Sequence, residues 1–313
     1  MPEAADRDAV NPPAVATRCG FIAIVGAPNA GKSTLVNTLV GAKVTIVSHK
    51  AQTTRVPVRG IAIEGGSQLI FIDTPGIFAP SRRLDRAMVD AAWARAADAD
   101  VVAVLVDAAR GDGETDAQHM LDRLAQTRSP CLLVLNKVDR VEKAKLLDIA
   151  QSLNARLPFG ATFMISALTG SGVEDLKQHL ARSVPAGPWH YPEDEISDAP
   201  LRLLAAEITR EKLYERLHDE LPYSTTVETT AWKDLRKRAV RIEQTIYVER
   251  ESQRKIVLGE GGRAIKQISM EARRELGEML EKTVHLFLHV KVRGGWQNDP
   301  ERYREIGLEF PKD

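Results

Sequence analysis

GAPNAGKS, residues 26–33, sets the architecture of the first half of the chain, because it follows an apolar run and opens a helix-like one. Its spacing fits G-x-x-x-x-G-K-[ST], a glycine-rich turn whose backbone N–H groups cradle phosphates at a helix N-terminus. We expect Lys32 to reach the β- and γ-phosphates of a nucleotide and Ser33 to bind Mg²⁺. The alternative is a glycine turn without a ligand. The predicted phosphate-binding residues are Gly26, Ala27, Pro28, Asn29, Ala30, Gly31, Lys32, Ser33 and Thr34.

The residues around this turn alternate between short apolar runs and longer amphipathic ones. The apolar runs, rich in β-branched residues, are residues 19–26, 68–73, 100–107, 130–137 and 161–166. The helix-like runs are residues 32–40, 84–97, 145–157 and 173–184. Strand and helix in alternation predict a mostly parallel sheet with helices on both faces and a ligand at the carboxyl ends of the strands. We therefore predict an α/β P-loop domain over residues 19–184.

Two polar motifs that follow apolar runs indicate which base is bound. In NKVD, residues 136–139, the Asp139 carboxylate can accept hydrogen bonds from guanine N1–H and the 2-amino group. Adenine offers an acceptor at N1 instead, and sites that depend on such bonds can reject the wrong partner by roughly 10⁴–10⁵. The backbone of SAL, residues 166–168, is expected near guanine O6. The predicted ligand is GTP, and its base-binding residues are Asn136, Lys137, Val138, Asp139, Ser166, Ala167 and Leu168.

DTPGI, residues 73–77, supplies the γ-phosphate end of the predicted site. Asp73 can hold Mg²⁺ through water, and the Gly76 N–H is placed to meet the γ-phosphate. In QTTR, residues 52–55, we expect Thr54 to contact both Mg²⁺ and the γ-phosphate, with Thr53 as the competing assignment. The predicted magnesium ligands are Ser33, Thr54 and Asp73, and the GTP-binding residues of this segment are Asp73, Thr74, Pro75, Gly76 and Ile77.

Ile77 stands where many GTPases carry a glutamine that orients the attacking water. Two readings follow. Either hydrolysis obtains its charge and orientation elsewhere, or GTP is a structural ligand of an RNA-binding assembly protein with vestigial hydrolysis. The intact phosphate and metal ligands favour the first, and we predict a slow GTPase. The predicted catalytic residues are Asn29, Lys32, Thr54 and Gly76.

Composition limits the remaining possibilities. The chain has 313 residues, enough for two domains of about 150 residues each. Its 43 basic and 43 acidic side chains balance, so net charge gives no reason to expect nucleic acid. Two cysteines are too few for a disulfide framework, and no apolar run approaches the length of a membrane span. Residues 1–18 lack an apolar core, which favours a disordered leader in a cytoplasmic protein.

The second half of the chain has a different pattern. Residues 185–200 hold four prolines and an acidic cluster, which predicts a linker between domains. Residues 201–313 then predict an α+β domain with the element order α-β-β-α-α-β and a C-terminal tail. We read KIVL, residues 255–258, as a strand that leads through a glycine turn into a helix.

That glycine turn indicates RNA binding. Residues 259–262 form G-x-x-G, and the element order is that of a type II KH domain, whose loop clamps about four nucleotides of single-stranded RNA. Residues 233–274 hold 12 basic and 6 acidic side chains, an excess that we expect to gather around the loop. A solvated charged surface is the alternative. The predicted RNA-binding residues are Gly259, Glu260, Gly261, Gly262, Arg263, Lys266, Arg236, Lys237 and Arg238.

Taken together, the P-loop, DTPG, NKVD and SAL motifs resemble those of the translation-factor-related GTPases. GPWHYPEDEISDAP (187–200), LPYS (221–224), SQRKIVLGEGG (252–262) and VHLFLHVKVRGGW (284–296) are similar to the Era family of bacterial GTPases. The resemblance covers nearly the whole chain from residue 19 onward. Glu260 departs from it, because it places an acid in a loop meant to meet phosphates.

The resemblance implies more than the motifs do alone. It implies a GTPase with Mg²⁺ that binds the 3′ end of small-subunit ribosomal RNA and assists maturation of the small ribosomal subunit. It also implies a K⁺ ion, held by Asn29, that supplies charge in place of the missing glutamine. Peripheral contact with the inner membrane is implied as well. We expect a monomer.

Overall fold

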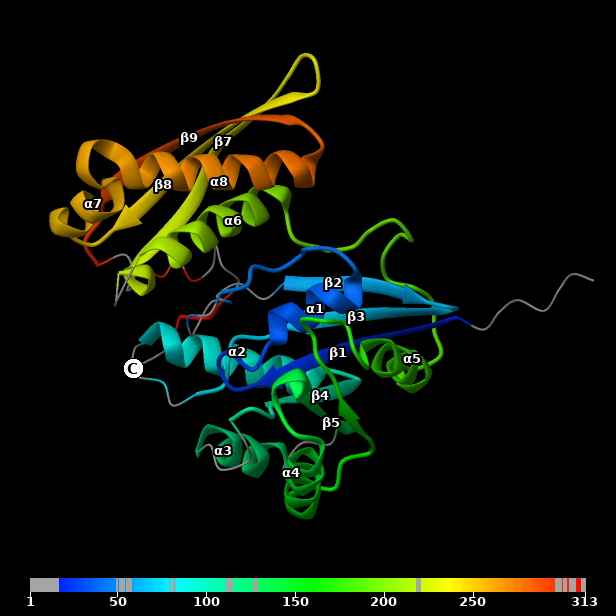
Figure 1. The fold of residues 1–313 in the computed structure, drawn as a ribbon. Helices are drawn as coiled ribbons and strands as arrows, with labels where there is room; N and C mark the ends of the chain where they lie inside the picture. The colour runs from blue at the N-terminus through cyan, green and yellow to red at the C-terminus, as the bar shows by residue number, and fades with distance from the viewer. Residues whose placement is uncertain are drawn as a thin grey trace, which may run out of the picture.

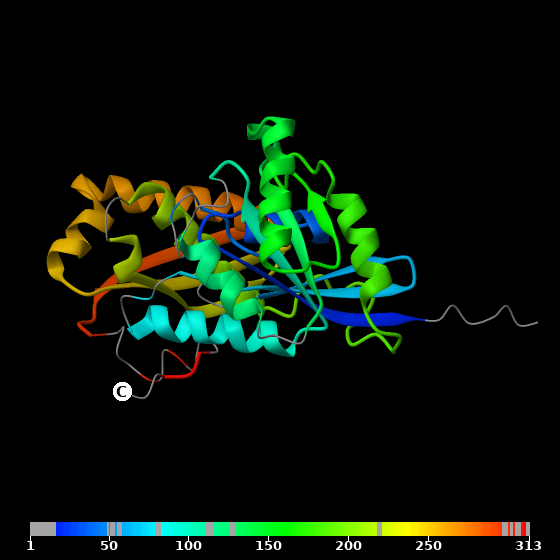
Figure 2. The same ribbon diagram turned by 90° about the horizontal axis from the view of Figure 1, so that it is seen from below.

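The computed structural model describes residues 17–48, 50, 54, 58–78, 80, 83–110, 115–125, 129–217, 221–295, 300, 303 and 308–310. Two sheets organise these residues (Figure 1). One has six strands in the order β2-β3-β1-β4-β5-β6, and the other has three in the order β7-β8-β9. In the view from below, the larger sheet and its helices lie nearer the viewer than the smaller unit (Figure 2).

The six-stranded sheet is the predicted α/β unit. Its parallel strands are β1 (Arg18–Gly26), β3 (Ser67–Asp73), β4 (Val101–Asp107), β5 (Cys131–Asn136) and β6 (Thr162–Met164). An edge strand, β2 (Val58–Glu64), runs antiparallel to β3 and was not predicted, although the prediction of a mostly parallel sheet is confirmed. The short helix η1 (Val138–Arg140) follows β5.

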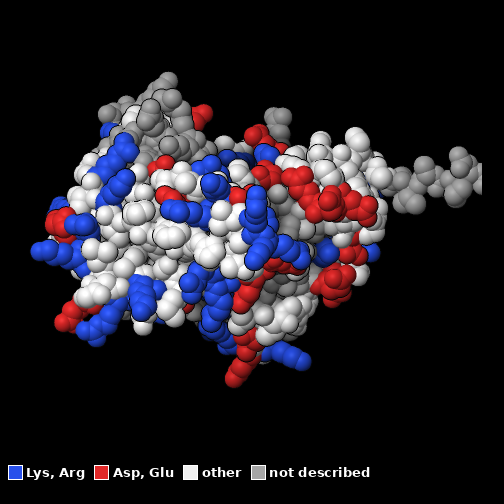
Figure 3. Space-filling view, turned by 90° about the horizontal axis from the view of Figure 1, so that it is seen from above, with Lys and Arg blue, Asp and Glu red and all other residues white. Residues whose placement is uncertain are grey.

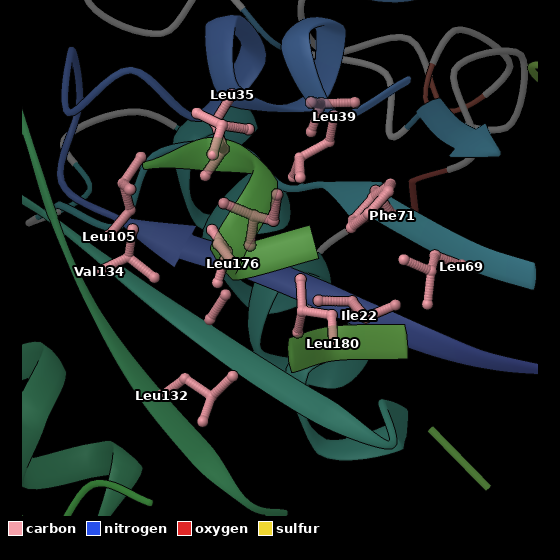
Figure 4. Packing of buried hydrophobic residues seen from close by; sticks show 14 of the residues in the cluster. Ile22, Leu35, Leu39, Leu69, Phe71, Leu105, Leu132, Val134, Leu176 and Leu180 are labelled. Carbon is pink, nitrogen blue, oxygen red and sulfur yellow. The ribbon is translucent and has the colours of Figure 1, made fainter. Parts of the chain in front are cut away.

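Helices cover both faces of this sheet, as the alternation of strand and helix predicts. α1 (Lys32–Val40) and α5 (Val173–Ser183) pack on one face. α2 (Arg83–Asp98), α3 (Thr115–Leu124) and α4 (Lys143–Arg156) pack on the other. Ile22 and Ile24 of β1 point to the first face, while Ala23 and Val25 point to the second, because successive side chains of a strand alternate. Figure 4 shows the first core, where leucines of α1 and α5 meet the strand residues.

The smaller unit has the predicted order α-β-β-α-α-β. It comprises α6 (Leu201–Arg216), η2 (Pro222–Ser224), β7 (Thr225–Leu235), β8 (Ala239–Val248), α7 (Glu251–Leu258), η3 (Glu260–Gly262), α8 (Arg263–Leu280) and β9 (Thr283–Val292). β7 and β8 form an antiparallel hairpin, and β9 runs parallel to β8. α6 and α8 pack through Leu204, Ile208, Ala272 and Leu276 against the same face of the sheet.

Residues 255–258 are not a strand, so this prediction is wrong. They form the last turn of α7, in which Val257 is buried and Ile256 is 57% exposed. The side chain of Gln253 accepts hydrogen bonds from the backbone N–H groups of Glu249 and Arg250, which fixes the start of the helix. This cap outweighs the β-branched pair that favours a strand.

Residues 185–200, the predicted linker, are hydrogen-bonded to the larger sheet. The Ile61 N–H of β2 donates to Ile196 O at 2.9 Å, so the segment runs along the edge strand of the larger sheet. The buried Gln68 side chain donates to Tyr191 O at 2.8 Å and accepts from the N–H of Tyr191 at 3.0 Å. The linker therefore connects the β2–β3 hairpin to α6, which begins at Leu201.

A second connection runs between the units. Lys43 pairs with Glu211 of α6 at 2.6 Å, and Glu211 also accepts the Val47 N–H at 2.7 Å. Lys50 donates to the carbonyls of Tyr214 and Leu217 at the end of α6. Lys43, Val47 and Lys50 are therefore held by the first helix of the smaller unit. None of the helices in the described part of the chain has both the length and the apolar character that a membrane span requires.

Candidate functional site

The glycine-rich turn at residues 26–31 is built for close backbone approach. A side chain at Gly26 would place its Cβ 2.4 Å from Leu105 O, so only glycine fits there. Gly31 is left-handed (φ 99°) directly before α1 begins. The Lys32 ammonium donates to Gly26 O at 3.0 Å and to Ala27 O at 2.9 Å. Burial lowers the pKa of Lys32 to about 8, and the Asp73 charge offsets part of that effect. An arriving phosphate would strengthen the charged form.

Three oxygen-bearing side chains meet at the phosphate end of the site. Asp73 Oδ2 accepts hydrogen bonds from Ser33 Oγ at 2.8 Å and Thr54 Oγ1 at 3.1 Å, and the two hydroxyls are 3.1 Å apart. Asp73 is fully buried, yet its Oδ1 has no hydrogen-bond partner among the described residues. Burial raises the pKa of Asp73 to about 6, although Ser33, Lys32 and Thr54 each act to lower it. A buried carboxylate oxygen without a partner, beside two hydroxyls, fits a hard cation such as Mg²⁺.

The side chain of Ile77 does not face this site. It is 6% exposed and packs among Val25, Val89 and Trp93 on the face of the sheet that α2, α3 and α4 cover. Its N–H donates to Gly26 O at 3.0 Å. Its neighbour Gly76 lines the cavity instead, and a Cβ there would approach the backbone of the glycine-rich turn at 3.0 Å. Residues 76–77 can therefore contact a γ-phosphate or a water through their backbone but not through a side chain.

At the other end, Asn136 ties two segments together. Its Nδ2 donates to Ala30 O at 2.8 Å, and its Oδ1 accepts the Ala167 N–H at 2.9 Å. Lys137, left-handed with φ 64°, donates to Asn29 O at 2.7 Å. The phosphate-binding turn, NKVD and SAL thus form one hydrogen-bonded frame. Such a frame holds the two ends of a nucleotide at a fixed separation.

Asp107 belongs to that frame and was not predicted. Its Oδ2 pairs with the Lys137 ammonium at 2.6 Å, and its Oδ1 accepts the Ala109 N–H at 3.0 Å. The signal was present in the sequence, because Asp107 ends a buried strand in the same way as Asp73 and Asn136 do. Polar residues that end parallel strands gather at one edge of the sheet.

A cavity of about 340 Å³ runs along this frame. Of the predicted nucleotide residues it is lined by Pro28, Asn29, Gly31, Lys32, Ser33, Thr34, Thr54, Gly76, Asn136, Lys137, Asp139, Ser166, Ala167 and Leu168. The predicted residues outside its lining are Gly26, Ala27, Ala30, Asp73, Thr74, Pro75, Ile77 and Val138. The lining residues that were not predicted are Val47, Ser48, Arg110 and Arg140. Thr53, the competing assignment for Thr54, lies outside the described residues.

The glycine turn of the smaller unit has a similar local design on an open surface. Gly261 (φ 61°) and Gly262 (φ 76°) have left-handed backbones, and a Cβ at either would meet nothing within 4 Å. Gly259 is different, because a Cβ there would lie 2.7 Å from that of Ala264. Arg263, at the start of α8, pairs with Glu260 at 3.0 Å, and both side chains are largely exposed. Arg263 is therefore paired with the acid of its own loop.

The basic excess is divided, so the expectation that it gathers around the loop holds only in part: Lys255, Arg263 and Lys266 lie beside the loop, but the basic stretch at residues 236–238 does not. Residues 236–238 form the turn between β7 and β8, and the Thr283 N–H at the start of β9 donates to Arg238 O. α8 separates this turn from the glycine loop by its full length, 18 residues or about 27 Å. Figure 1 shows the two turns at opposite ends of the smaller unit.

Two family models match the chain. One, described as a 50S ribosome-binding GTPase, matches residues 21–137, and one described as a KH domain matches residues 220–297. Among curated relatives, the chain is 62% identical over 298 residues to GTPase Era of Brucella suis biovar 1. It is 61% identical over 298 residues to GTPase Era of Bradyrhizobium diazoefficiens. Each alignment covers 95% of this chain and 96% of the relative.

Two solved structures of Era also match the fold of the chain. The fold superposes with a TM-score of 0.88 on a crystal structure of Era in complex with MgGDPNP and nucleotides 1506–1542 of 16S ribosomal RNA. It superposes equally well on a crystal structure of a single-residue variant of Aquifex aeolicus Era bound to GDP·AlF₄⁻. Both are 37% identical, and both alignments cover 93% of this chain and 99% of the other.

Proposed function

The chain belongs to the Era family of GTPases, and on that premise we propose a GTP-hydrolysing switch that acts on ribosomal RNA. The RNA is the 3′ end of the small-subunit ribosomal RNA, and the switch assists maturation of the small ribosomal subunit. The description of one family model names the 50S ribosome, which is the large subunit. The solved relative that covers 93% of the chain instead carries 16S RNA, which belongs to the small subunit. The proposal therefore names the small subunit.

The observation that carries the nucleotide proposal is the continuity of the cavity. Lys32, Ser33 and Thr54 line one end and Asp139 lines the other, so phosphate-binding and base-binding groups share one wall. The relative with MgGDPNP supports GTP and Mg²⁺ as the ligands. Mg²⁺ would be held by Ser33, Thr54 and Asp73, and it would supply charge that neutralises the phosphates.

For hydrolysis, we propose that Asn29 holds a K⁺ ion in place of the missing glutamine. Asn29 has a left-handed backbone, its backbone carbonyl accepts a hydrogen bond from the Lys137 ammonium, and the residue lines the cavity. No described residue hydrogen-bonds to its amide, so the amide oxygen can take a ligand. Positive charge at the transferred phosphoryl group is what phosphoryl transfer requires, and partner-supplied arginines contribute roughly 10³–10⁵ in rate.

The RNA proposal rests on the glycine loop. Gly261 and Gly262 leave the backbone open to phosphates at the N-terminus of α8, and Arg263 and Lys266 are exposed beside it. The relative bound to nucleotides 1506–1542 of 16S ribosomal RNA supports this choice of partner.

Three finer proposals and one prediction complete the assignment. We propose the boundaries 1–18, 19–184, 185–200 and 201–313 for leader, GTPase domain, linker and KH domain. We also propose that the chain works as a monomer in the cytoplasm. Contact with the inner membrane stays a prediction from the family resemblance. Co-sedimentation with lipid vesicles tests it, and protein left in the supernatant would contradict it.

The central experiment measures GTP turnover in potassium and in sodium buffer, with and without 3′-end ribosomal RNA. We expect slow turnover that potassium stimulates and that Asn29→Ala makes indifferent to the cation. Undetectable turnover in both buffers with RNA present would reject the switch and leave GTP as a structural ligand. Turnover that is brisk but insensitive to the cation and to Asn29 would reject only the K⁺ role.

A further inference from the structure

The turn between β7 and β8 concentrates positive charge at a projecting tip. Leu235 pairs with Ala239, so Arg236, Lys237 and Arg238 form a three-residue connection that we call the basic turn. All three side chains are exposed, as is Lys233 on the adjoining strand. In Figure 3, which views the molecule from above, lysine and arginine side chains gather over the left and centre, whereas acidic ones crowd toward the right.

The acidic side chains near the basic turn already have ion-pair partners, and these partners lie outside the turn. Asp234 pairs with Lys282 at 2.8 Å, and Glu243 pairs with Arg241 at 2.8 Å. Among the described residues, none makes a side-chain hydrogen bond or ion pair with the three members of the basic turn. Their charges are therefore available to a partner from outside the chain.

The backbone of the basic turn is strained for the residues that it carries. Lys237 has φ 60° and Arg238 has φ 52°, both in the left-handed region. Hairpin turns normally place asparagine or glycine there, because other L-residues lose about 1 kcal/mol or more in that conformation. Local preference does not favour two long cations at these positions. Since no described contact holds them, a role outside the folded chain accounts for their presence better than stability does.

We propose, resting on the RNA-binding function above, that the basic turn is a second phosphate-binding site. It takes the backbone of an RNA segment beyond the nucleotides that the glycine loop clamps. A G-x-x-G loop holds about four nucleotides, and α8 places the basic turn about 27 Å from that loop. The relative's RNA, nucleotides 1506–1542, is many times longer than that footprint. Three exposed cations without a groove contact phosphates irrespective of sequence.

The test uses full-length protein, two RNAs and two variants of the basic turn. One RNA is a short single strand that covers only the loop's footprint, and the other is the longer segment equivalent to nucleotides 1506–1542. The first variant is Arg236→Glu with Lys237→Glu and Arg238→Glu. Its matched control reverses three exposed cations of α4, by Lys143→Glu, Lys145→Glu and Arg156→Glu, with the same change in net charge.

We expect the first variant to bind the long RNA at least tenfold more weakly and the short RNA as the wild type does. The slope of log K against log salt for the long RNA should decrease by about 2, since each lost phosphate contact removes about 0.7–0.9. The α4 control should bind both RNAs normally. Wild-type affinity of the first variant for the long RNA would overturn the proposal, and so would an equal loss for both RNAs.

The second variant, Lys237→Asn with Arg238→Gly, separates function from folding. It relieves the left-handed strain, so we expect an unchanged or higher midpoint of thermal unfolding together with weaker binding of the long RNA. Stabilisation with full RNA binding would overturn the proposal. Binding of the wild type, but not of the first variant, to vesicles of anionic lipid with RNA binding unaffected would assign the turn to a membrane surface instead. If the wild type binds neither RNA, the proposed function itself fails.

Discussion

The chain contains two glycine-rich turns that lead into the N-terminus of a helix, residues 26–31 before α1 and residues 259–262 before α8. Both end in a left-handed glycine, and both leave backbone N–H groups for an anion. The first is enclosed, with Lys32 6% exposed and bonded to the turn itself. The second is open, with nothing within 4 Å of a Cβ at Gly261.

The difference lies in what each turn can recognise. An enclosed turn holds its donors in fixed positions at low dielectric, so a phosphate that fits gains charge-assisted bonds that solvent does not screen. An open turn meets phosphates in water, where salt weakens the contact and several such contacts are needed. The same local chemistry therefore suits a compact nucleotide in one place and a long polyanion in the other.

The largest effect is expected from a substitution that removes the cation of the enclosed turn. Lys32→Ala removes a buried cation and should weaken GTP binding by roughly 10²–10³, because charge-assisted hydrogen bonds are worth about 1.5–3 kcal/mol each. RNA binding in the absence of nucleotide should be unchanged. Fluorescent-nucleotide titration measures the effect, and Lys145→Ala on the exposed surface of α4 is the control. A loss below about threefold would show that the buried lysine does not meet the phosphates.

The next largest effect is expected from a double substitution in the open turn. Glu260→Asp with Gly261→Asp keeps a backbone that tolerates aspartate at positive φ but adds charge where phosphates approach. We expect RNA binding to be abolished and GTP affinity to stay intact. Gly65→Asp is the control, since Gly65 is also left-handed with open space around its Cβ. Full RNA binding by the double variant in an electrophoretic shift assay would show that the loop is not the clamp.

The enclosed turn was predictable from sequence because its residues follow strands at one sheet edge. The motifs at residues 26–33, 73–77, 136–139 and 166–168 meet in the structure for that reason. Val47, Ser48 and Arg110 were not predicted, because they reach the cavity from loops whose paths no periodicity specifies. Arg140 is the last residue of η1, one position beyond the NKVD motif, and the motif itself does not include it. Likewise, the spread of the basic excess depended on how α8 runs, since nearness in sequence does not give nearness across an 18-residue helix.

A smaller effect concerns pH at the metal site. Because burial raises the pKa of Asp73 to about 6, the folded protein holds this proton more tightly than the unfolded chain. Without metal, Asp73 therefore makes folding less favourable as pH rises from about 4 to about 6. Mg²⁺ needs the carboxylate, so Mg²⁺ affinity should fall up to about tenfold per pH unit below about 6. Calorimetric titration at about pH 5 and about pH 7 checks this, and equal affinities at both would contradict it.

Glu211 joins the larger unit to the smaller one, so we expect it to affect how the bound nucleotide changes RNA affinity. Its side chain is 2% exposed, pairs with Lys43 and accepts a hydrogen bond from the Val47 N–H. Glu211→Gln removes the charge that anchors Lys43 and Val47 on α6. We expect the ratio of RNA affinities with GTP and with GDP to change by about threefold to tenfold, in the range of typical coupling energies. GTP affinity measured without RNA is the control, and an unchanged ratio would show that coupling runs elsewhere, for example through residues 185–200.

The smallest expected effect sharpens the comparison instead of breaking it. Glu260→Gln frees Arg263 from its exposed partner, so the arginine can meet a phosphate without first losing an ion pair. Exposed pairs are worth little, at most about 1 kcal/mol, and the RNA gain should therefore be only about twofold to fivefold. The gain should shrink as salt rises, because screening already weakens the pair. Weaker RNA binding by Glu260→Gln would mean that Glu260 contacts the RNA directly, for instance by accepting from a base amino group. An open turn would then read sequence as well as charge.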